Sequence, residues 1–257
     1  REQMYNLVDL KGKRILVTGA SSGIGKEIVT LLDQLEAETI LIARREENLK
    51  EIVTGLENKK SCYYVADLSQ LNEIEGLIKE IVAERGPLDG FVHSAGIASS
   101  RPFRTIKPDI LDQVMKINFY SFVELCRCLT AKKRFSETGC NIVGISSTSS
   151  ILGNSSKTAY CASKAAMDAA VRCMAKELAN KHIRVNTVAP AFIKTDIYES
   201  FLEKGEGSKD AELTMARQYL GLGRPSDVAN LTAFLLSEAS RFITGSTIGV
   251  DGGKLSW

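Results

Sequence analysis

The chain has 257 residues, and its 33 Lys and Arg residues nearly balance its 31 Asp and Glu residues, which gives a formal net charge of +2. The charges are spread along the chain in short runs, so a nucleic-acid partner is not expected. No apolar stretch reaches the length of a membrane span, so a membrane partner is not expected either.

The cysteines and histidines form no metal-binding pattern. There are six cysteines and two histidines, and no two cysteines form a Cys-x-x-Cys pair, which argues against a zinc cluster. Several cysteines fall in apolar, periodic stretches, which predicts buried free thiols. Free thiols suit a reducing compartment, so we expect a cytoplasmic protein without a bound metal.

Apolar strands alternate with amphipathic helical stretches along the whole chain. In residues 25–35 and 71–85 the apolar side chains share one helix face. Such alternation is typical of a parallel sheet covered on both faces. We therefore predict one doubly wound (Rossmann) α/β domain over residues 1–257, with a seven-stranded parallel sheet in a three-layer α/β/α arrangement. The expected strands are Arg14–Thr18, Thr39–Ala43, Cys62–Val65, Gly90–His93, Asn141–Ile145, Arg184–Ala189 and Thr247–Val250.

The first strand runs directly into a glycine-rich turn, Thr18–Gly25, which a helix follows. Glycines let the chain turn tightly and bring backbone N–H groups close to a pyrophosphate, and the helix N-terminus adds the positive end of its dipole. The turn therefore predicts a dinucleotide site, although its spacing is G-x-x-x-G-x-G rather than G-x-G-x-x-G. A purely structural turn is the alternative.

The second strand ends in Arg44-Arg45. In an NAD site an acidic residue at this place accepts hydrogen bonds from the ribose hydroxyls, whereas an arginine pairs with a 2′-phosphate. The arginines therefore favour NADP(H) over NAD(H). The alternative is that both arginines only begin a solvated helix, with Glu46 and Glu47 as their partners.

Asp67 follows the third strand. A carboxylate at the carboxyl end of a strand can reach an adenine amino group, and it can also cap a helix that begins near Ser69. Both interpretations remain open and are compatible with each other.

Tyr160 and Lys164 are four residues apart in a helical stretch that begins near Thr158, so they share one helix face. A nearby ammonium favours the phenolate and is expected to lower the pKa of the tyrosine toward neutrality, where acid–base catalysis is efficient. Ser147 follows the fifth strand, and its hydroxyl is expected to hold a substrate carbonyl beside the tyrosine.

Residues 195–223 break the alternation of strands and helices. They are polar and rich in glycine, and a long segment without a strand pattern inside a compact domain is often functional. We expect a substrate lid here, made of one or two short helices over the site.

The order and spacing of the glycine-rich turn, Ser147, Tyr160 and Lys164 resemble the short-chain dehydrogenase/reductase family. The similarity is to its single-domain branch, which includes 3-oxoacyl-acyl-carrier-protein reductases, and it covers about residues 10 to 253. Asn118 matches the asparagine that holds a water molecule between the lysine and solvent in that family.

The resemblance implies an oxidoreductase that transfers a hydride between NADP(H) and a carbonyl or secondary alcohol substrate. Tyr160 is implied as the general acid and base, Ser147 as the group that stabilises the carbonyl oxygen, and Lys164 as the ligand of the nicotinamide ribose. The implied catalytic residues are Asn118, Ser147, Tyr160 and Lys164. The implied cofactor contacts are Gly19, Ser21, Ser22, Gly23, Ile24, Arg44, Arg45, Asp67, Leu68, Ser94, Ala95, Gly96, Tyr160, Lys164, Pro190, Ile193 and Thr195.

The chain departs from the family pattern at two places. After the fourth strand it has His93-Ser94-Ala95-Gly96 where the family often has Asn-Asn-Ala-Gly, and we interpret His93 as a structural hydrogen-bonding substitute. After the sixth strand it has Pro190-Ala191 where the family usually has Pro-Gly. Alanine resists positive φ, so the backbone facing the nicotinamide is expected to differ slightly.

The substrate stays open between a hydroxyacyl thioester, a steroid, a sugar and a small ketone. It is expected to depend on Ser99–Thr105, Ile151–Lys157 and the 195–223 segment. The resemblance also implies a homo-oligomer, a dimer or tetramer, formed through the helices near 108–132 and 158–180. The alternative function is a cofactor-binding regulatory or scaffold protein of the same fold without turnover.

Overall fold

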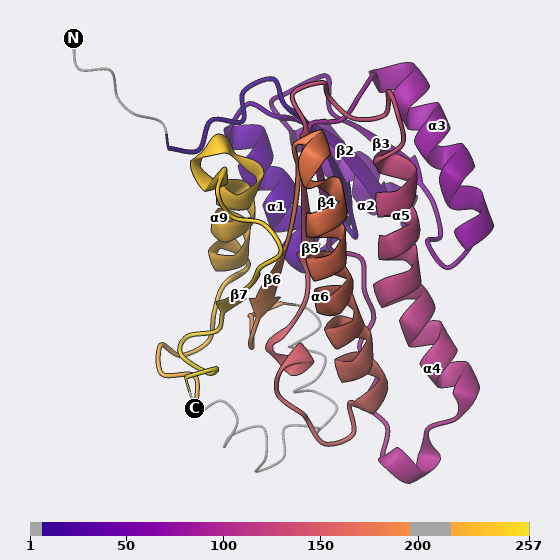
Figure 1. Cartoon of the computed structure of the whole chain (residues 1–257), viewed down its shortest axis with the longest axis vertical. Coiled ribbons are helices and arrows are strands. Elements are labelled where there is room, and N and C mark those ends of the chain that lie inside the picture. Colours follow the sequence, from indigo (N-terminus) through magenta and orange to yellow (C-terminus); the bar gives the residue numbers. More distant parts are fainter. Residues whose placement is uncertain (1–6, 196–216, 257) are drawn as a thin grey trace.

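The computed structural model describes residues 7–195 and 217–256, and its centre is a seven-stranded parallel sheet with the order β3-β2-β1-β4-β5-β6-β7. Figure 1 shows the sheet enclosed by helices. The strands are β1 (Arg14–Thr18), β2 (Glu38–Ala43), β3 (Cys62–Val65), β4 (Gly90–His93), β5 (Cys140–Ile145), β6 (Ile183–Pro190) and β7 (Thr247–Val250).

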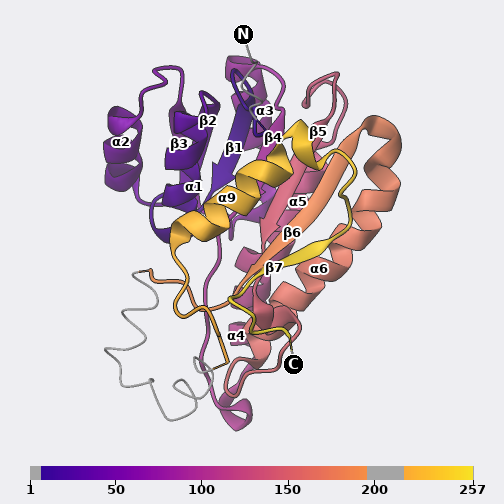
Figure 2. The same ribbon diagram turned by 90° about the vertical axis from the view of Figure 1, so that its left-hand side faces the viewer.

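The helices cover both faces of the sheet, as the side view in Figure 2 shows. One face carries α1, α2 and α9, and the other carries α3, α4, α5 and α6. A π-helical segment, Lys116–Tyr120, joins α4 to α5. The helix bounds are α1 (Gly23–Gln34), α2 (Glu46–Gly55), α3 (Ile74–Arg85), α4 (Pro108–Met115), α5 (Ser121–Leu129), α6 (Thr158–Leu178) and α9 (Pro225–Leu236).

Two apolar cores lie between the sheet and its helical layers. The first packs α1, α2 and α9 against one face and includes Ile28, Leu49 and Val228. The second packs α3, α5 and α6 against the other face and includes Ile78, Phe122 and Met167. The central strands β1, β4 and β5 are buried on both faces, so most of their side chains are apolar instead of alternating.

The predicted fold class is confirmed, with strand boundaries within one residue of those expected. The predicted helix at 25–35 is α1, and the one at 71–85 is a single 3₁₀ turn followed by α3. Most of the predicted lid, residues 196–216, lies outside the described residues. Across the described part of the chain, no helix combines the length and apolar character that crossing a bilayer requires.

The strand order reverses between β1 and β4, which lie side by side although two strands separate them in the sequence. The connections leave these two strands toward opposite faces, so the carboxyl edge of the sheet opens at this switch point. Ligands bind at this place in open parallel sheets. The glycine-rich turn follows β1 at this edge, and the Ser94–Gly96 stretch follows β4.

Two glycines allow the turn after β1 to pack closely. Gly19 has φ +65°, and a Cβ there would lie 2.6 Å from the Ala95 nitrogen. A Cβ on Gly25 would overlap the carbonyl oxygen of Gly19. Gly19 therefore lets the turn pack against the segment after β4, and Gly25 lets the beginning of α1 pack against the turn, because neither residue has a Cβ.

A matched pair of glycine substitutions tests this packing. Gly25→Ala forces the turn away from α1, and we expect loss of nicotinamide-cofactor binding and destabilisation by at least about 1 kcal/mol. Gly76→Ala in α3 meets no atom within 4 Å and is expected to stabilise the protein by about 0.5–1 kcal/mol through helix propensity. Denaturant unfolding and cofactor titration of both variants measure this. Equal behaviour of the two variants would contradict the packing argument.

Candidate active site

The N-terminus of α1 is built to face an anion. Ser22 occupies the N-cap position, but its side chain does not cap the helix, and the first turn carries no acidic residue. Gly23 follows with φ +53°. An uncapped helix N-terminus presents backbone N–H groups and the positive end of the helix dipole. This geometry fits the pyrophosphate of a dinucleotide.

Arg45 links the end of β2 to the glycine-rich turn. Its Nη2 donates to the hydroxyls of Ser21 (3.2 Å) and Ser22 (2.9 Å). Arg44 is exposed, and its charge helps to lower the pKa of Asp67. The Arg45 guanidinium and two hydroxyls therefore gather at the start of α1, while Arg44 lies closer to Asp67. The alternative partners Glu46 and Glu47 make no ion pair with either arginine among the described residues.

Asp67 caps the turn after β3. Its Oδ1 accepts a hydrogen bond from the Ser69 nitrogen at 3.0 Å, and this bond is the main reason that its pKa is lowered. The bond closes a local turn, and the next helical turn begins at Leu71 with Gln70 at its N-cap, so the predicted helix cap is not formed. The exposed carboxylate lies at the carboxyl edge of the sheet, and its contact with an adenine amino group stays a prediction. The Leu68 side chain is buried in the second core, so only its backbone can face a cofactor.

Asn118 lies in the π-helical segment between α4 and α5 and is fully buried. Its side chain exchanges two hydrogen bonds with the backbone of Ile97, at 2.8 Å and 3.0 Å, and donates to Ser163 Oγ at 3.0 Å. Single π-helical turns often occur at functional sites. Here the extra residue turns the asparagine toward the segment that follows β4.

Gly96 brings that segment against the catalytic candidates. A Cβ at Gly96 would lie 3.3 Å from Asn118 Oδ1 and 3.4 Å from Lys164 Nζ. The segment after β4, the π-helical segment and α6 therefore meet at one point. The structure thus joins three predicted site residues that belong to three separate segments of the chain.

Ser147, Tyr160 and Lys164 meet at the carboxyl end of β5. Lys164, on α6, is 4% exposed, and its Nζ donates to the Ile145 carbonyl at 2.7 Å and lies 5.9 Å from the centre of the Tyr160 ring. Burial lowers the pKa of Lys164 to about 8. Ser147 is 8% exposed, and its Oγ accepts a hydrogen bond from the Ser149 nitrogen at 3.1 Å.

The expected lowering of the Tyr160 pKa is wrong. Burial raises the pKa of Tyr160, and a hydrogen bond with Ser147 opposes that rise. The Lys164 ammonium does not reverse this rise, because it is directed to the Ile145 carbonyl. Tyr160 is therefore a protonated phenol, which is the form that donates a proton.

His93 is a structural residue of the central sheet. It is fully buried, and its Nδ1 lies 3.0 Å from the Thr18 hydroxyl, which in turn accepts from the Ala95 nitrogen at 3.3 Å. Burial and the charge of Lys164 lower the pKa of His93 to about 3. A histidine that stays neutral at physiological pH fits the structural interpretation and does not exchange protons there.

The Pro190-Ala191 departure leaves an ordinary backbone. Among the described residues four non-glycine residues have positive φ, and Ala191 is not one of them. The Ala191 nitrogen donates to the Val250 carbonyl at 3.1 Å, so β7 supports this stretch. Ile193 is 6% exposed and packs in the first core, and Thr195 lies 3.7 Å from where a Gly23 Cβ would stand. Thr195 therefore faces the glycine-rich turn.

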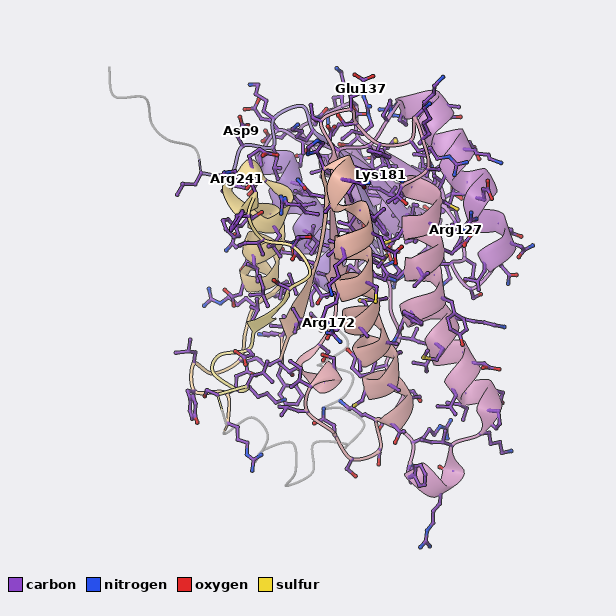
Figure 3. The ribbon with its side chains drawn as sticks, viewed as in Figure 1. Asp9, Arg127, Glu137, Arg172, Lys181 and Arg241 are labelled. Atoms are coloured by element: carbon purple, nitrogen blue, oxygen red, sulfur yellow. The ribbon has the colours of Figure 1, made fainter. Side chains whose placement is uncertain are left out.

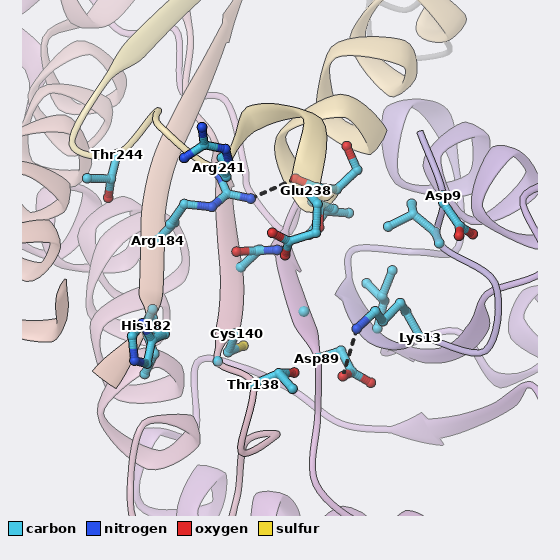
Figure 4. A pocket seen from close by; sticks show the side chains of 18 of the residues that line it. Asp9, Lys13, Asp89, Thr138, Cys140, His182, Arg184, Glu238, Arg241 and Thr244 are labelled. Atoms are coloured by element: carbon cyan, nitrogen blue, oxygen red, sulfur yellow. Dashed lines mark hydrogen bonds and ion pairs between the residues drawn. The ribbon is translucent and has the colours of Figure 1, made fainter. Parts of the chain in front are cut away.

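A separate cavity of about 520 Å³ lies at the opposite, amino-terminal edge of the strands. Figure 4 shows Lys13 paired with Asp89 there, at 3.7 Å. The guanidinium of Arg184 donates to the backbone carbonyls of Leu235, Ser237 and Ile243. None of the predicted site residues lines this cavity. Arg184 thus joins β6 to the end of α9 and to the segment that precedes β7.

Comparison with known proteins agrees with this geometry. Residues 19–254 match the family model described as enoyl-(acyl carrier protein) reductase. The chain is 34% identical over 246 residues to the 3-oxoacyl-[acyl-carrier-protein] reductase FabG of Thermotoga maritima, covering 95% of this chain and 98% of the relative. This chain belongs to the short-chain dehydrogenase/reductase family. The L-xylulose reductase of Caenorhabditis elegans is 33% identical over 248 residues, covering 95% of this chain and 96% of that one.

Solved structures of the family superpose closely. A short-chain type dehydrogenase/reductase from Mycobacterium ulcerans has a TM-score of 0.87 at 29% identity and covers 96% of this chain and 90% of its own. A variant of the actinorhodin polyketide ketoreductase, solved with NADPH, has a TM-score of 0.88 at 27% identity and covers 96% and 98%.

Several groups in the site of this short-chain dehydrogenase/reductase were missed by the sequence analysis. They are the Thr18 hydroxyl, the Ile97 backbone, the Ser163 hydroxyl and the Ile145 carbonyl. A sequence motif is a pattern of side chains, so it cannot show which backbone groups will line a site. A serine or threonine in an apolar stretch likewise does not show which group its hydroxyl will bind. In the described part of the chain, no cluster of histidine, cysteine and acidic side chains is arranged to hold a metal ion.

The buried Lys164 makes the protein less stable at neutral pH. The difference between a pKa of 10.5 and one of about 8 corresponds to roughly 3 kcal/mol against the charged form. This cost is present below the folded pKa and disappears as the pH approaches the unfolded value. From about pH 7 to about pH 9.5 we therefore expect wild type to gain roughly 2 kcal/mol of stability relative to Lys164→Met.

Denaturant unfolding of both proteins at the two pH values measures this difference. The exposed Lys181, labelled in Figure 3, provides the control: Lys181→Met and wild type should differ by the same amount at both pH values. A difference between wild type and Lys164→Met that does not change with pH would show that Lys164 is not destabilised by burial.

Proposed function

We propose that the protein is an NADPH-dependent carbonyl reductase in which Tyr160 transfers the proton. The observation that carries this proposal is the meeting of Ser147, Tyr160 and Lys164 at the end of β5. They lie at the same edge of the sheet as the uncapped N-terminus of α1. A dinucleotide with its pyrophosphate at α1 then extends along the carboxyl edge toward the tyrosine.

The cofactor, when bound, supplies the hydride that goes to the carbonyl carbon. Tyr160 donates its phenolic proton to the carbonyl oxygen as negative charge develops there. Ser147 stabilises the same oxygen by hydrogen bonding. Because burial keeps the tyrosine protonated, the phenol enters the reaction in its proton-donating form.

Lys164 and Asn118 assist Tyr160 without contacting the substrate carbonyl. The lysine ammonium lies between the Ile145 carbonyl and the tyrosine ring, within reach of ribose hydroxyls bound at the edge. Asn118, fixed by Ile97 and Ser163, holds the position beside Lys164 through which a proton is resupplied from solvent.

Three observations support a preference for NADPH. Arg44 and Arg45 follow β2, and Arg45 is already oriented by the hydroxyls of Ser21 and Ser22. No acidic residue takes the place directly after β2 where the ribose of NAD is bound. Among the similar structures, the polyketide ketoreductase was solved with NADPH.

The relatives' names support a carbonyl substrate. Two of them are described as a 3-oxoacyl-[acyl-carrier-protein] reductase and an L-xylulose reductase, and the solved neighbour is a ketoreductase. These names cover an acyl chain, a sugar and a polyketide. The shared chemistry is reduction of a ketone, and we assign that class to this chain. Location in the cytoplasm and assembly into a homo-oligomer stay predictions.

Cofactor titration tests the arginines. Arg44→Ala and Arg45→Ala should each weaken NADPH binding by about tenfold to a hundredfold, because a charge-assisted hydrogen bond to phosphate is lost. NADH binding should change far less. Nicotinamide fluorescence at physiological salt measures both, with the exposed Lys50→Ala on α2 as the control. Binding of NADH as tight as that of NADPH by wild type would disprove the NADPH assignment.

Tyr160→Phe tests the reaction. Loss of the hydroxyl removes the proton donor, so turnover of a reducible ketone should fall by about a hundredfold or more, while NADPH affinity is unchanged. The control is Tyr64→Phe, whose hydroxyl donates to Glu84 beside the edge strand β3. Near-normal turnover by Tyr160→Phe would refute its role. Intact NADPH binding without reduction of any ketone in a broad panel would favour the cofactor-binding scaffold instead.

A further inference from the structure

Lys254 is a buried lysine outside the catalytic group. It lies in the turn after β7 and is 4% exposed, with its Nζ 4.3 Å from the centre of the Phe192 ring. Among residues 7–195 and 217–256, its ammonium makes neither an ion pair nor a hydrogen bond to a side chain. A buried ammonium is costly unless an anion or hydrogen-bond acceptors compensate it, and the Phe192 ring face supplies only part of that compensation.

The carboxylate of Asp251, on the same turn, accepts hydrogen bonds from the backbone of that turn. Asp251 accepts a hydrogen bond from the Gly253 nitrogen on one oxygen at 3.1 Å, and from the Leu255 nitrogen on the other at 2.6 Å. These bonds fold the turn that carries Lys254. Asp251 therefore positions the lysine, and its charge attracts the ammonium at a distance, but both of its oxygens accept hydrogen bonds from backbone amides and neither forms an ion pair with Lys254.

A second cation lies near the first. Burial and the charge of Lys157 lower the pKa of Lys254 to about 8, and the charge of Asp251 opposes them, so both side chains lie close enough to Lys254 to interact with it electrostatically. Lys157 stands at the N-cap position of α6, three residues before Tyr160. Two like charges at one place repel each other, and an anion between them would remove this repulsion.

Lys254 follows β7 and Lys157 precedes the helix of Tyr160, so both lysines belong to the carboxyl edge of the sheet that carries the tyrosine. Phe192 is the second residue after β6, and the Gln218 side chain fixes it by accepting from its backbone nitrogen at 3.1 Å and donating to its backbone oxygen at 3.0 Å. Lys157 ends the loop that precedes the tyrosine helix. The two lysines therefore lie at the same edge as Tyr160, Lys254 at the end of the sheet and Lys157 at the start of α6.

We propose that the substrate carries an anionic group, a carboxylate or a phosphate, and that Lys254 binds it with Lys157 as the second cation. This inference rests on the proposed reductase function and specifies its substrate class. The anion is expected to hold the substrate by the end remote from its carbonyl. Lys254 is thus a specificity-determining residue and takes no part in proton transfer.

Two matched pairs of probes test the inference and separate the two anions. The first pair is 4-oxopentanoate and its methyl ester, and the second is dihydroxyacetone phosphate and dihydroxyacetone. In wild type, kcat/KM is expected to favour the charged member of at least one pair by about tenfold or more, since a hydrogen bond to a charged group is gained. The favoured pair identifies carboxylate or phosphate.

Lys254→Gln should reduce that preference by about tenfold, and Lys254→Arg should keep most of it. Lys157→Gln is expected to reduce it less, and Lys181→Gln, at the amino-terminal edge of the sheet, should not change it. Because the measure is a ratio between two substrates, a general loss of folded enzyme does not alter it. No preference in wild type, or a preference that survives in Lys254→Gln, would overturn the inference.

Thermal unfolding in saturating NADPH gives a readout that does not depend on turnover, and the cofactor occupies the arginines at 44 and 45. The charged probes should raise the midpoint of wild type and leave that of Lys254→Gln unchanged. If no probe is reduced but the charged ones still stabilise wild type through Lys254, the reductase function fails and the anion site stands. If ketones are reduced and no charged probe stabilises the protein, the anion site fails alone.

Discussion

The structure of the site depends on one buried ammonium, that of Lys164. It is placed by a single hydrogen bond to the Ile145 carbonyl at the end of β5, at 2.7 Å. Because that carbonyl ends a central strand, the lysine ties the first two turns of α6 to the sheet. The tyrosine one turn earlier is held at the same edge. Burial lowers the lysine pKa and raises the tyrosine pKa, so the tyrosine stays protonated at neutral pH and the lysine releases its proton more readily than an exposed lysine.

The neighbouring segments reach this point only because their backbones come unusually close. Gly96 leaves space for Lys164 and Asn118, and Gly19 leaves space for the Ala95 backbone. The π-helical turn rotates Asn118 toward the same point. Small residues and one irregular helical turn thus bring together the ends of β1, β4 and β5 and the beginning of α6, which have no sequence proximity.

Charge divides the edge of the sheet into separate parts. Arg45 lies at the start of α1 and Arg44 near Asp67, at the end of the edge where we propose a cofactor phosphate, and Lys254 and Lys157 lie at the end of the sheet and the start of α6, where we propose an anionic substrate group. Between these places, the proposed catalytic group contains one buried cation, Lys164. Such separation orients a dinucleotide and a substrate toward each other along the edge, because each anionic end has its own cations.

Sequence patterns alone were enough to predict the seven strands, their parallel arrangement and the candidates Ser147, Tyr160 and Lys164, because apolar runs, a glycine-rich turn and an i, i+4 pair are local features. They could not predict the direction of the tyrosine pKa, since burial and the Ile145 carbonyl come from segments far away in the chain. They also left Lys254 unnoticed, because a lysine after a Gly-Gly turn looks like any solvated residue. Folding placed that lysine over Phe192 and occupied Asp251 with backbone amides, and burial is a property of the folded chain rather than of a residue's neighbours in sequence.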